Sequence, residues 1–183
     1  MAKLVPTTKV THKGLQINLR SPELGEGEAL LKVVKEIFRT SAHLLTQPDE
    51  FTFTTEQENE FIQSYLAHPD KIIILAEVEG EIVGMMSFAV GGKRRIAHTG
   101  EFGVSLLPEF QGKGVGECMV KALAEWARAN PRVEALRLRV HAQNTGAVGL
   151  YRKLGFREEG REIRGAKMGP DSYDDVLLMA LDV

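Results

Sequence analysis

Apolar and polar residues follow two different periods along the chain, and each change of period marks the boundary of a structural element. Apolar residues three and four positions apart are typical of a helix with one buried side, whereas alternation or a short apolar run indicates a strand. The pattern predicts helices at about 21–38, 55–67, 117–128 and 144–154. It predicts strands at about 15–19, 71–77, 82–90, 99–107, 136–140, 156–163 and 173–181.

Turn-forming residues separate these elements. Pro69, Pro108 and Pro131 each end a periodic segment, and a final hairpin is expected to turn within 165–172. The order β-α-α-β-β-β-α-β-α-β-β predicts an α/β fold, with a mixed, mainly antiparallel twisted sheet of about seven strands and helices on both faces. A chain of 183 residues is most simply a single domain over 1–183.

A glycine-rich segment lies between the strand at 99–107 and the helix at 117–128. It consists of Gln111, Gly112, Lys113, Gly114, Val115 and Gly116. Glycine lets the backbone approach a ligand, and a helix N-terminus adds partial positive charge, so the segment predicts a phosphate-bearing ligand held mainly by backbone N–H groups. Lys113 either adds charge near a phosphate or is solvated. A strand-to-helix turn without any ligand is the alternative.

The spacing excludes two common phosphate loops. A P-loop needs Ser or Thr after Gly-Lys, and here Gly114 follows Lys113. A dinucleotide fingerprint reads G-x-G-x-x-G early in a βαβ unit, and here the glycines alternate in the second half of the chain. The order Gln-x-x-Gly-x-Gly after a strand instead resembles the acetyl-CoA loop of the GNAT N-acetyltransferase superfamily. The segment 144–156 resembles its second motif, an Asn followed by a helix that ends Tyr-x-x-x-Gly-Phe.

This resemblance, close over about 98–156, implies a GNAT-like fold and an enzyme that transfers the acetyl group of acetyl-CoA to a primary amine by direct attack in a ternary complex. The backbone of 111–116 would hold the CoA pyrophosphate. The strand residues Val104, Ser105 and Leu106 would run beside the pantetheine arm, with a backbone N–H facing the thioester carbonyl. Asn144 would contact the CoA arm and could also cap the helix that it begins.

The resemblance also implies roles in proton transfer. Tyr151 would protonate the departing thiolate, a roughly balanced step because a thiol has a pKa of ~8.5 and a phenol ~10; the alternative is a tyrosine that only packs in the core. Glu101 is our first choice for the base that removes a proton from the amine, and an ion-paired strand glutamate is its alternative. His98 and His141 are further candidates for carrying a proton, and a surface histidine at a strand end is the alternative for each. Ribosomal-protein alanine N-acetyltransferases carry a catalytic Glu five residues before the motif Asn, where this chain has Arg139.

The acceptor is expected to be a small-molecule amine or a peptide N-terminus. Its pocket would involve the first two helices, the loop at 40–53 and the final hairpin. Four residues of that hairpin suggest a site for a cationic amine, and a solvated acidic turn is the alternative. They are Asp171, Tyr173, Asp174 and Asp175.

Composition adds few constraints. The net charge of −2 does not indicate a nucleic-acid partner, and neither a signal peptide nor a membrane span is apparent, so a cytoplasmic location is expected. The single cysteine, Cys118, begins the helix after the loop, as a favoured thiolate or as a small, partly buried residue. No spacing suits a metal site. Edge pairing through the final hairpin is a route to a homodimer. A catalytically silent acetyl-CoA-binding regulator and another nucleotide-binding module are the alternative functions.

Overall fold

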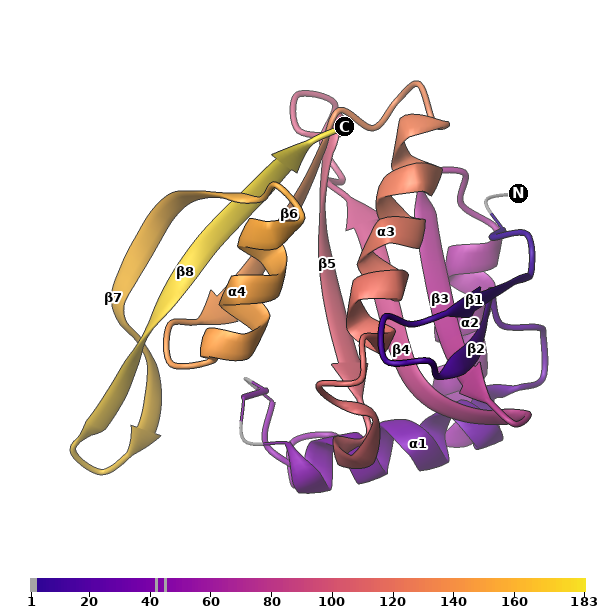
Figure 1. The fold of residues 1–183 in the computed structure, drawn as a ribbon, viewed down its shortest axis with the longest axis horizontal. Coiled ribbons are helices and arrows are strands. Elements are labelled where there is room, and N and C mark those ends of the chain that lie inside the picture. The colour runs from indigo at the N-terminus through magenta and orange to yellow at the C-terminus, as the bar shows by residue number, and fades with distance from the viewer. Residues whose placement is uncertain (1–2, 42, 45) are drawn as a thin grey trace.

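The computed structural model describes residues 3–41, 43–44 and 46–183. It contains one eight-stranded sheet in the order β1-β2-β3-β4-β5-β6-β8-β7, with helices on both faces (Figure 1). The strands are β1 (Thr7–Val10), β2 (Gln16–Arg20), β3 (Lys71–Val78), β4 (Glu81–Val90), β5 (Thr99–Leu106), β6 (Ala135–His141), β7 (Arg157–Gly169) and β8 (Ser172–Asp182). The helices are α1 (Gly27–Thr40), α2 (Thr55–Leu66), α3 (Val115–Arg128) and α4 (Thr145–Lys153), with a short 3-10 turn at Pro108–Phe110.

The predicted mixed, mainly antiparallel α/β sheet is confirmed. All neighbouring strands run antiparallel except β5 and β6, which are parallel. The strand β1 was not predicted, because its four residues are mostly exposed at a sheet edge and show no apolar alternation. This exposed strand is held in place by its pairing with β2, and such pairing leaves no pattern in the sequence of β1.

Two predicted boundaries are wrong. The first helix begins at Gly27 rather than near 21, because the preceding residues form turns in which Glu26 binds Arg20 and accepts a hydrogen bond from the Glu23 N–H. The strand expected at 156–163 continues to Gly169, and the final hairpin turns between Gly169 and Ser172, within the predicted 165–172. Around Gly165 the strand does not turn. The register of β7 shifts between Glu162 and Ala166, because a glycine inside a strand often marks a bulge.

Two apolar cores stabilise the sheet, one on each face. The larger core joins α3 and α4 to the strands and includes Met119, Leu123 and Phe102. The smaller one joins α1 and α2 to β3 and β4. The strand β3 contributes Ile72 and Ile74 to the first core, and Ile73 and Leu75 to the second. Its continuous apolar run therefore follows from burial on both faces.

The strands β5 and β6 pair over only a short distance. Their register joins three residue pairs and ends at Glu101 and Arg137, although β5 continues to Leu106 and β6 to His141. Beyond these residues each strand pairs only on its outer side, β5 with β4 and β6 with β8. The sheet therefore opens into a slot between them, and Figure 1 shows the two halves diverging there, with α3 beside one and α4 beside the other.

Candidate functional site

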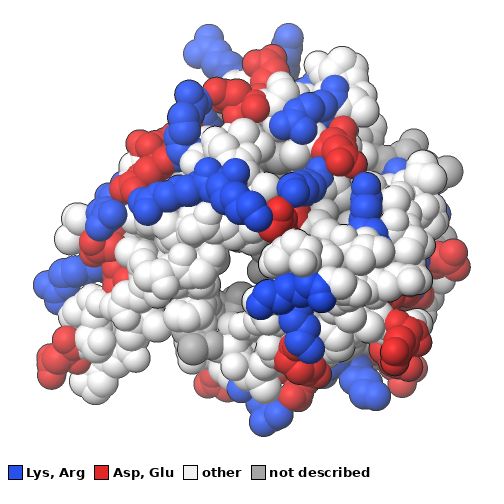
Figure 2. Space-filling view, viewed as in Figure 1, with Lys and Arg blue, Asp and Glu red and all other residues white. Residues whose placement is uncertain are grey.

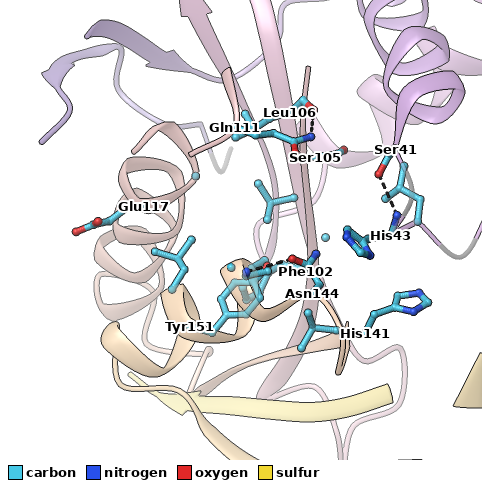
Figure 3. A pocket seen from close by; sticks show the side chains of 18 of the residues that line it. Ser41, His43, Phe102, Ser105, Leu106, Gln111, Glu117, His141, Asn144 and Tyr151 are labelled. Carbon is cyan, nitrogen blue, oxygen red and sulfur yellow. Dashed lines mark hydrogen bonds between the residues drawn. The ribbon is translucent and has the colours of Figure 1, made fainter. Parts of the chain in front are cut away.

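A cleft of about 820 Å³ occupies the slot between β5 and β6. Figure 3 shows α3 with Glu117 on one side of it and His43 and His141 on the other. In Figure 2 a hollow separates the hairpin lobe from the body of the molecule, and Lys and Arg side chains lie near its rim. Residues from β4, β5, β6, α3 and α4 and from the segment after α1 line the cleft. The cleft has the volume that a large cofactor arm and a second substrate need.

The β5 backbone offers hydrogen bonds to the cleft. The Leu107 N–H bonds to the Val83 carbonyl oxygen, and in an antiparallel ladder every second residue bonds to the same neighbour. The odd-numbered residues of β5 therefore pair with β4, and the N–H and C=O groups of Val104 and Leu106 point into the slot. The side-chain amide of Gln111 donates to the Leu106 carbonyl at 3.1 Å, which fixes the glycine segment against the end of β5.

The glycine segment wraps the N-terminus of α3 at one end of the cleft. Gly112 and Gly114 have φ values of 65° and 87°, which other residues rarely adopt, and Gly114 is the N-cap of the helix. The first helical hydrogen bond runs from the Cys118 N–H to the Gly114 carbonyl, so the N–H groups of the preceding turn have no partner within the helix. Gly112, Gly114 and Gly116 all line the cleft.

Two residues of this segment point elsewhere. The Lys113 ammonium lies 5.4 Å from the centroid of the Phe110 ring, and the Val115 side chain is fully buried in the larger core. Glu117 lies in the first turn of α3, where its carboxylate accepts from Lys121 and Lys153, each at 2.8 Å. The Lys121 contact, followed by the Lys153 contact, lowers the Glu117 pKa to about 2.

Tyr151 and Asn144 reach the cleft from α4. The Asn144 side chain accepts from the Ala147 N–H at 3.2 Å, so it caps this helix. The Tyr151 ring packs between Phe102 and Phe156, with ring centroids 6.0 and 5.6 Å away. Only 6% of Tyr151 is exposed, and this burial raises the pKa of its phenol to about 12. Tyr151 is therefore a core residue whose phenol stays neutral in the cleft wall.

The opposite sheet face carries Glu101. Side chains alternate along β5, so Phe102 faces α4 whereas Glu101, Gly103 and Ser105 face the side of α1 and α2. Glu101 is exposed and lines the cleft. It forms no ion pair with any residue that the structure describes, which disfavours the structural alternative for this glutamate.

His141 ends β6 beside the same cleft. Its Nδ1 lies 3.2 Å from the Asp174 carboxylate, and its side chain is 5% exposed. The Nε2 of this ring is buried and has no hydrogen-bond partner among the residues that the structure describes. His98, in contrast, lies exposed before β5 and does not line the cleft.

Residues 31–156, more than half of the chain, match the family model described as the Acetyltransferase (GNAT) family. The chain belongs to this family. The GNAT structure from Streptococcus pneumoniae superposes with a TM-score of 0.88 at 25% identity, covering 91% of this chain and 99% of that one. The acetyltransferase yncA from Salmonella typhimurium, solved with its cofactor acetyl-CoA, has a TM-score of 0.79 at 18% identity, covering 91% and 93%.

A curated GNAT relative is the L-amino acid N-acetyltransferase AaaT of Escherichia coli, 28% identical over 87 residues. The match includes 48% of this chain and 54% of AaaT, so the chain spans about half the length of this relative. No cluster of three or more His, Cys, Asp or Glu that could hold a metal occurs among residues 3–41, 43–44 and 46–183. Within those ranges, no helix is long and apolar enough to cross a membrane.

The structure changes two sequence-based hypotheses about this GNAT chain. The four acceptor residues of the final hairpin do not form one acidic surface: Asp174 is buried against His141, and Asp175 contacts Arg161 and the Arg164 N–H. Tyr173 lies under the Arg164 guanidinium, 3.8 Å away, and Asp171 is in the hairpin turn. Burial raises the pKa of the Cys118 thiol, so the favoured thiolate is wrong and the partly buried helix residue is confirmed.

Sequence reasoning missed several residues of the cleft wall. They are His12, Met85, Ser87 and Glu117, whereas Ser41 and His43 belong to the loop at 40–53 that was expected at the acceptor pocket. His12 lies between β1 and β2, where there is no catalytic motif, and only tertiary contacts bring it to the cleft. Arg139, noted in the sequence as a departure from ribosomal-protein acetyltransferases, also lines the cleft, where it pairs with Glu162.

Proposed function

We propose that this GNAT protein is an acetyl-CoA-dependent N-acetyltransferase that acts on the primary amine of a small molecule or a peptide N-terminus. One observation carries the proposal: the glycine segment, the free backbone edge of β5 and Tyr151 meet in a single cleft. An anion cradle, a strand-like docking edge and a buried acid are the parts that a large acyl thioester needs. No metal is required for this chemistry.

The donor would enter from the side of α3. The N–H groups of 111–116 and the helix N-terminus would bind the pyrophosphate. The pantetheine amides would pair with Val104 and Leu106 as an added strand, with Ser105 between them, and Asn144 would contact the arm. The Val104 N–H would then face the thioester carbonyl. A donor aimed at a developing oxyanion typically lowers the barrier by ~3 kcal/mol.

Tyr151 would protonate the thiolate as the C–S bond breaks. Its pKa of about 12 makes the transfer less balanced than the ordinary phenol value predicts. The same burial disfavours the thiolate anion in the cleft, so the pKa of the CoA thiol would rise together with that of the Tyr151 phenol. The raised pKa also keeps the phenol protonated at every pH at which an amine can attack.

The acceptor would approach from the face opposite α4. Glu101 would attract its ammonium group toward the thioester. The uncovered sheet face beside β5 and β6 lets an amine on a small molecule or on a peptide end reach the thioester from this side. The relative AaaT, named for L-amino acids, supports including amino acids in the acceptor panel.

Calorimetry with acetyl-CoA, followed by a CoA-release assay over a panel of amines, amino acids and peptides, tests the proposal. We expect binding and turnover with at least one amine. Absence of acetyl-CoA binding would refute it. Tight binding without turnover on any acceptor would favour the alternative, a catalytically silent acetyl-CoA-binding regulator.

A further inference from the structure

The His141 ring has a buried nitrogen with no partner, and this occurs in the wall of the proposed catalytic cleft. Buried polar atoms in folded proteins are nearly always hydrogen-bonded, so an exception calls for a water, a ligand or a catalytic role. We infer that His141, oriented by Asp174, is the group that accepts the proton of the incoming amine. This inference rests on the proposed transferase function.

The contacts of Asp174 fix the protonation of the ring. The carboxylate of Asp174 is 4% exposed and lies 3.2 Å from His141 Nδ1 and 3.4 Å from the Gln143 N–H. An ionised carboxylate only accepts hydrogen bonds, so Nδ1 must carry the hydrogen. In a neutral imidazole the other nitrogen then has a free lone pair. Asp174 thus leaves Nε2 as a proton acceptor, the arrangement by which a buried Asp orients the His of catalytic triads.

The position of His141 suits an acceptor-side base. Glu101 and Arg137 are register partners, so their side chains share one sheet face, and alternation places Arg139 and His141 on that face as well. Tyr151 approaches from the other face, on α4. A proton acceptor and a proton donor therefore flank the slot in which the thioester would lie. The exposed His43 ring is the next imidazole, with its centroid 6.2 Å from that of His141.

The proposed reaction balances with these two groups. His141 Nε2 removes one proton from the ammonium, directly or through one water, and the neutral amine attacks the thioester carbon. The tetrahedral intermediate collapses with cleavage of the C–S bond as Tyr151 gives its proton to sulfur. The phenolate then recovers the surplus proton of the acylated nitrogen, which keeps one hydrogen as the amide N–H, and the imidazolium releases its proton to solvent. The products are the N-acetyl amine, CoA thiol and one proton.

Glu101 then has a different role from the one that the sequence suggested. Its carboxylate is exposed at the cleft, so it can attract a cationic acceptor without removing the proton itself. The two carboxylates therefore differ: Glu101 would act on binding, and Asp174 would act through the ring of His141. Asp174 is a positioning residue.

Amines of different basicity distinguish proton removal by His141 from ammonium binding by Glu101, because the first affects kcat and the second KM. The test uses the best amine of the panel and its β,β,β-trifluorinated analogue, whose amine is largely neutral at pH 7. We expect H141N, which can still donate to Asp174, to lower kcat by about 100-fold with the basic amine and by less than about threefold with the fluorinated one. D174N should show the same dependence on basicity. E101Q, the control, should raise KM for the basic amine with a smaller change in kcat. Equal losses for both amines, or none, would overturn the inference.

Nitrogen NMR of the wild-type ring provides a readout that needs no acceptor. With ¹⁵N-labelled histidine at pH 8, we expect a protonated Nδ1 and an unprotonated Nε2 for His141, and D174N should remove this preference. An Nε2–H tautomer in the wild type would overturn the inference even if acetyl transfer is observed. Lack of acetyl-CoA binding would refute the proposed function instead, so the two failures are distinguishable.

Discussion

At the scale of single residues, burial decides what the functional groups can do. Tyr151 was identified by its place in a motif, and its packing against Phe102 and Phe156 was an alternative to catalysis. In the structure this packing leaves the phenol 6% exposed, which raises its pKa and keeps it protonated. A group that is to donate a proton must be protonated in this way. The two interpretations of this tyrosine are therefore compatible.

Replacing Tyr151 by Phe should separate catalysis from binding. We expect Y151F to lower kcat by about 100-fold, because the thiolate loses its proton donor, while the Kd for acetyl-CoA changes less than about twofold. The aromatic contacts remain, so the fold should be retained. CoA release and calorimetry measure the two quantities, and wild-type turnover in Y151F would remove Tyr151 as the acid.

The raised pKa of Tyr151 also predicts a change of stability at high pH. In the unfolded chain the phenol ionises near pH 10, whereas in the fold it holds its proton to about 12. The free energy of unfolding should therefore fall as the pH rises from 10 to 12, by at most about 2–3 kcal/mol from this group. Urea unfolding of wild type and Y151F at several pH values isolates this contribution. Parallel curves for the two proteins would contradict it.

At the scale of elements, the glycine segment and the N-terminus of α3 act as one unit. The backbone has positive φ values at Gly112 and Gly114, and these require glycine, whereas Gly116 lies within the helix. A Cβ at Gly116 would contact Leu106 and Leu150 at an ordinary 3.7 Å, whereas one at Gly114 would come within 2.7 Å of the His12 ring. The three glycines thus have different reasons to lack a side chain.

Alanine at two of these positions should have opposite effects on stability. We expect G116A to retain or raise the melting temperature, because alanine favours a helix interior by up to ~1 kcal/mol, and to weaken acetyl-CoA binding about tenfold or more by filling the cradle. G114A should lower the melting temperature, because of its φ of 87° and the His12 contact. Thermal unfolding and calorimetry test both. Unchanged acetyl-CoA affinity in G116A would contradict the anion cradle.

At the scale of the whole molecule, the opening between β5 and β6 creates the site. Three register pairs join these strands before the slot begins, and Figure 1 shows α3 beside one half of the sheet and α4 beside the other. A ligand in the slot would contact both halves. Acetyl-CoA is therefore expected to stabilise the fold as well as to fill the cleft.

This expectation gives a prediction for thermal stability. At a concentration 100 times its Kd, a ligand that binds only the folded state adds about 2.7 kcal/mol, which for a chain of this size corresponds to roughly 5–10 °C. We expect that shift in the wild type and a much smaller one in G116A at the same concentration. Differential scanning fluorimetry measures both, and equal shifts would show that the ligand does not use the glycine segment.

The sequence by itself determined the parts whose signals are local. The alternating glycines, the Asn144 and Tyr151 spacing and the apolar periods depend on neighbouring residues, so the glycine turn into α3, the helix cap and the mixed sheet could be predicted. The edge strand β1 and the continuation of β7 beyond 163 could not be predicted, because pairing and a bulge determine them.

Only the tertiary structure decided the surroundings of the catalytic groups. Asp174 looked like part of an acidic acceptor site in the sequence, but the pairing of β6 with β8 buries it against His141. Their separation of 33 positions in the sequence leaves no local pattern. Burial and partner contacts set the proton affinity of a side chain, and both arise when distant strands meet.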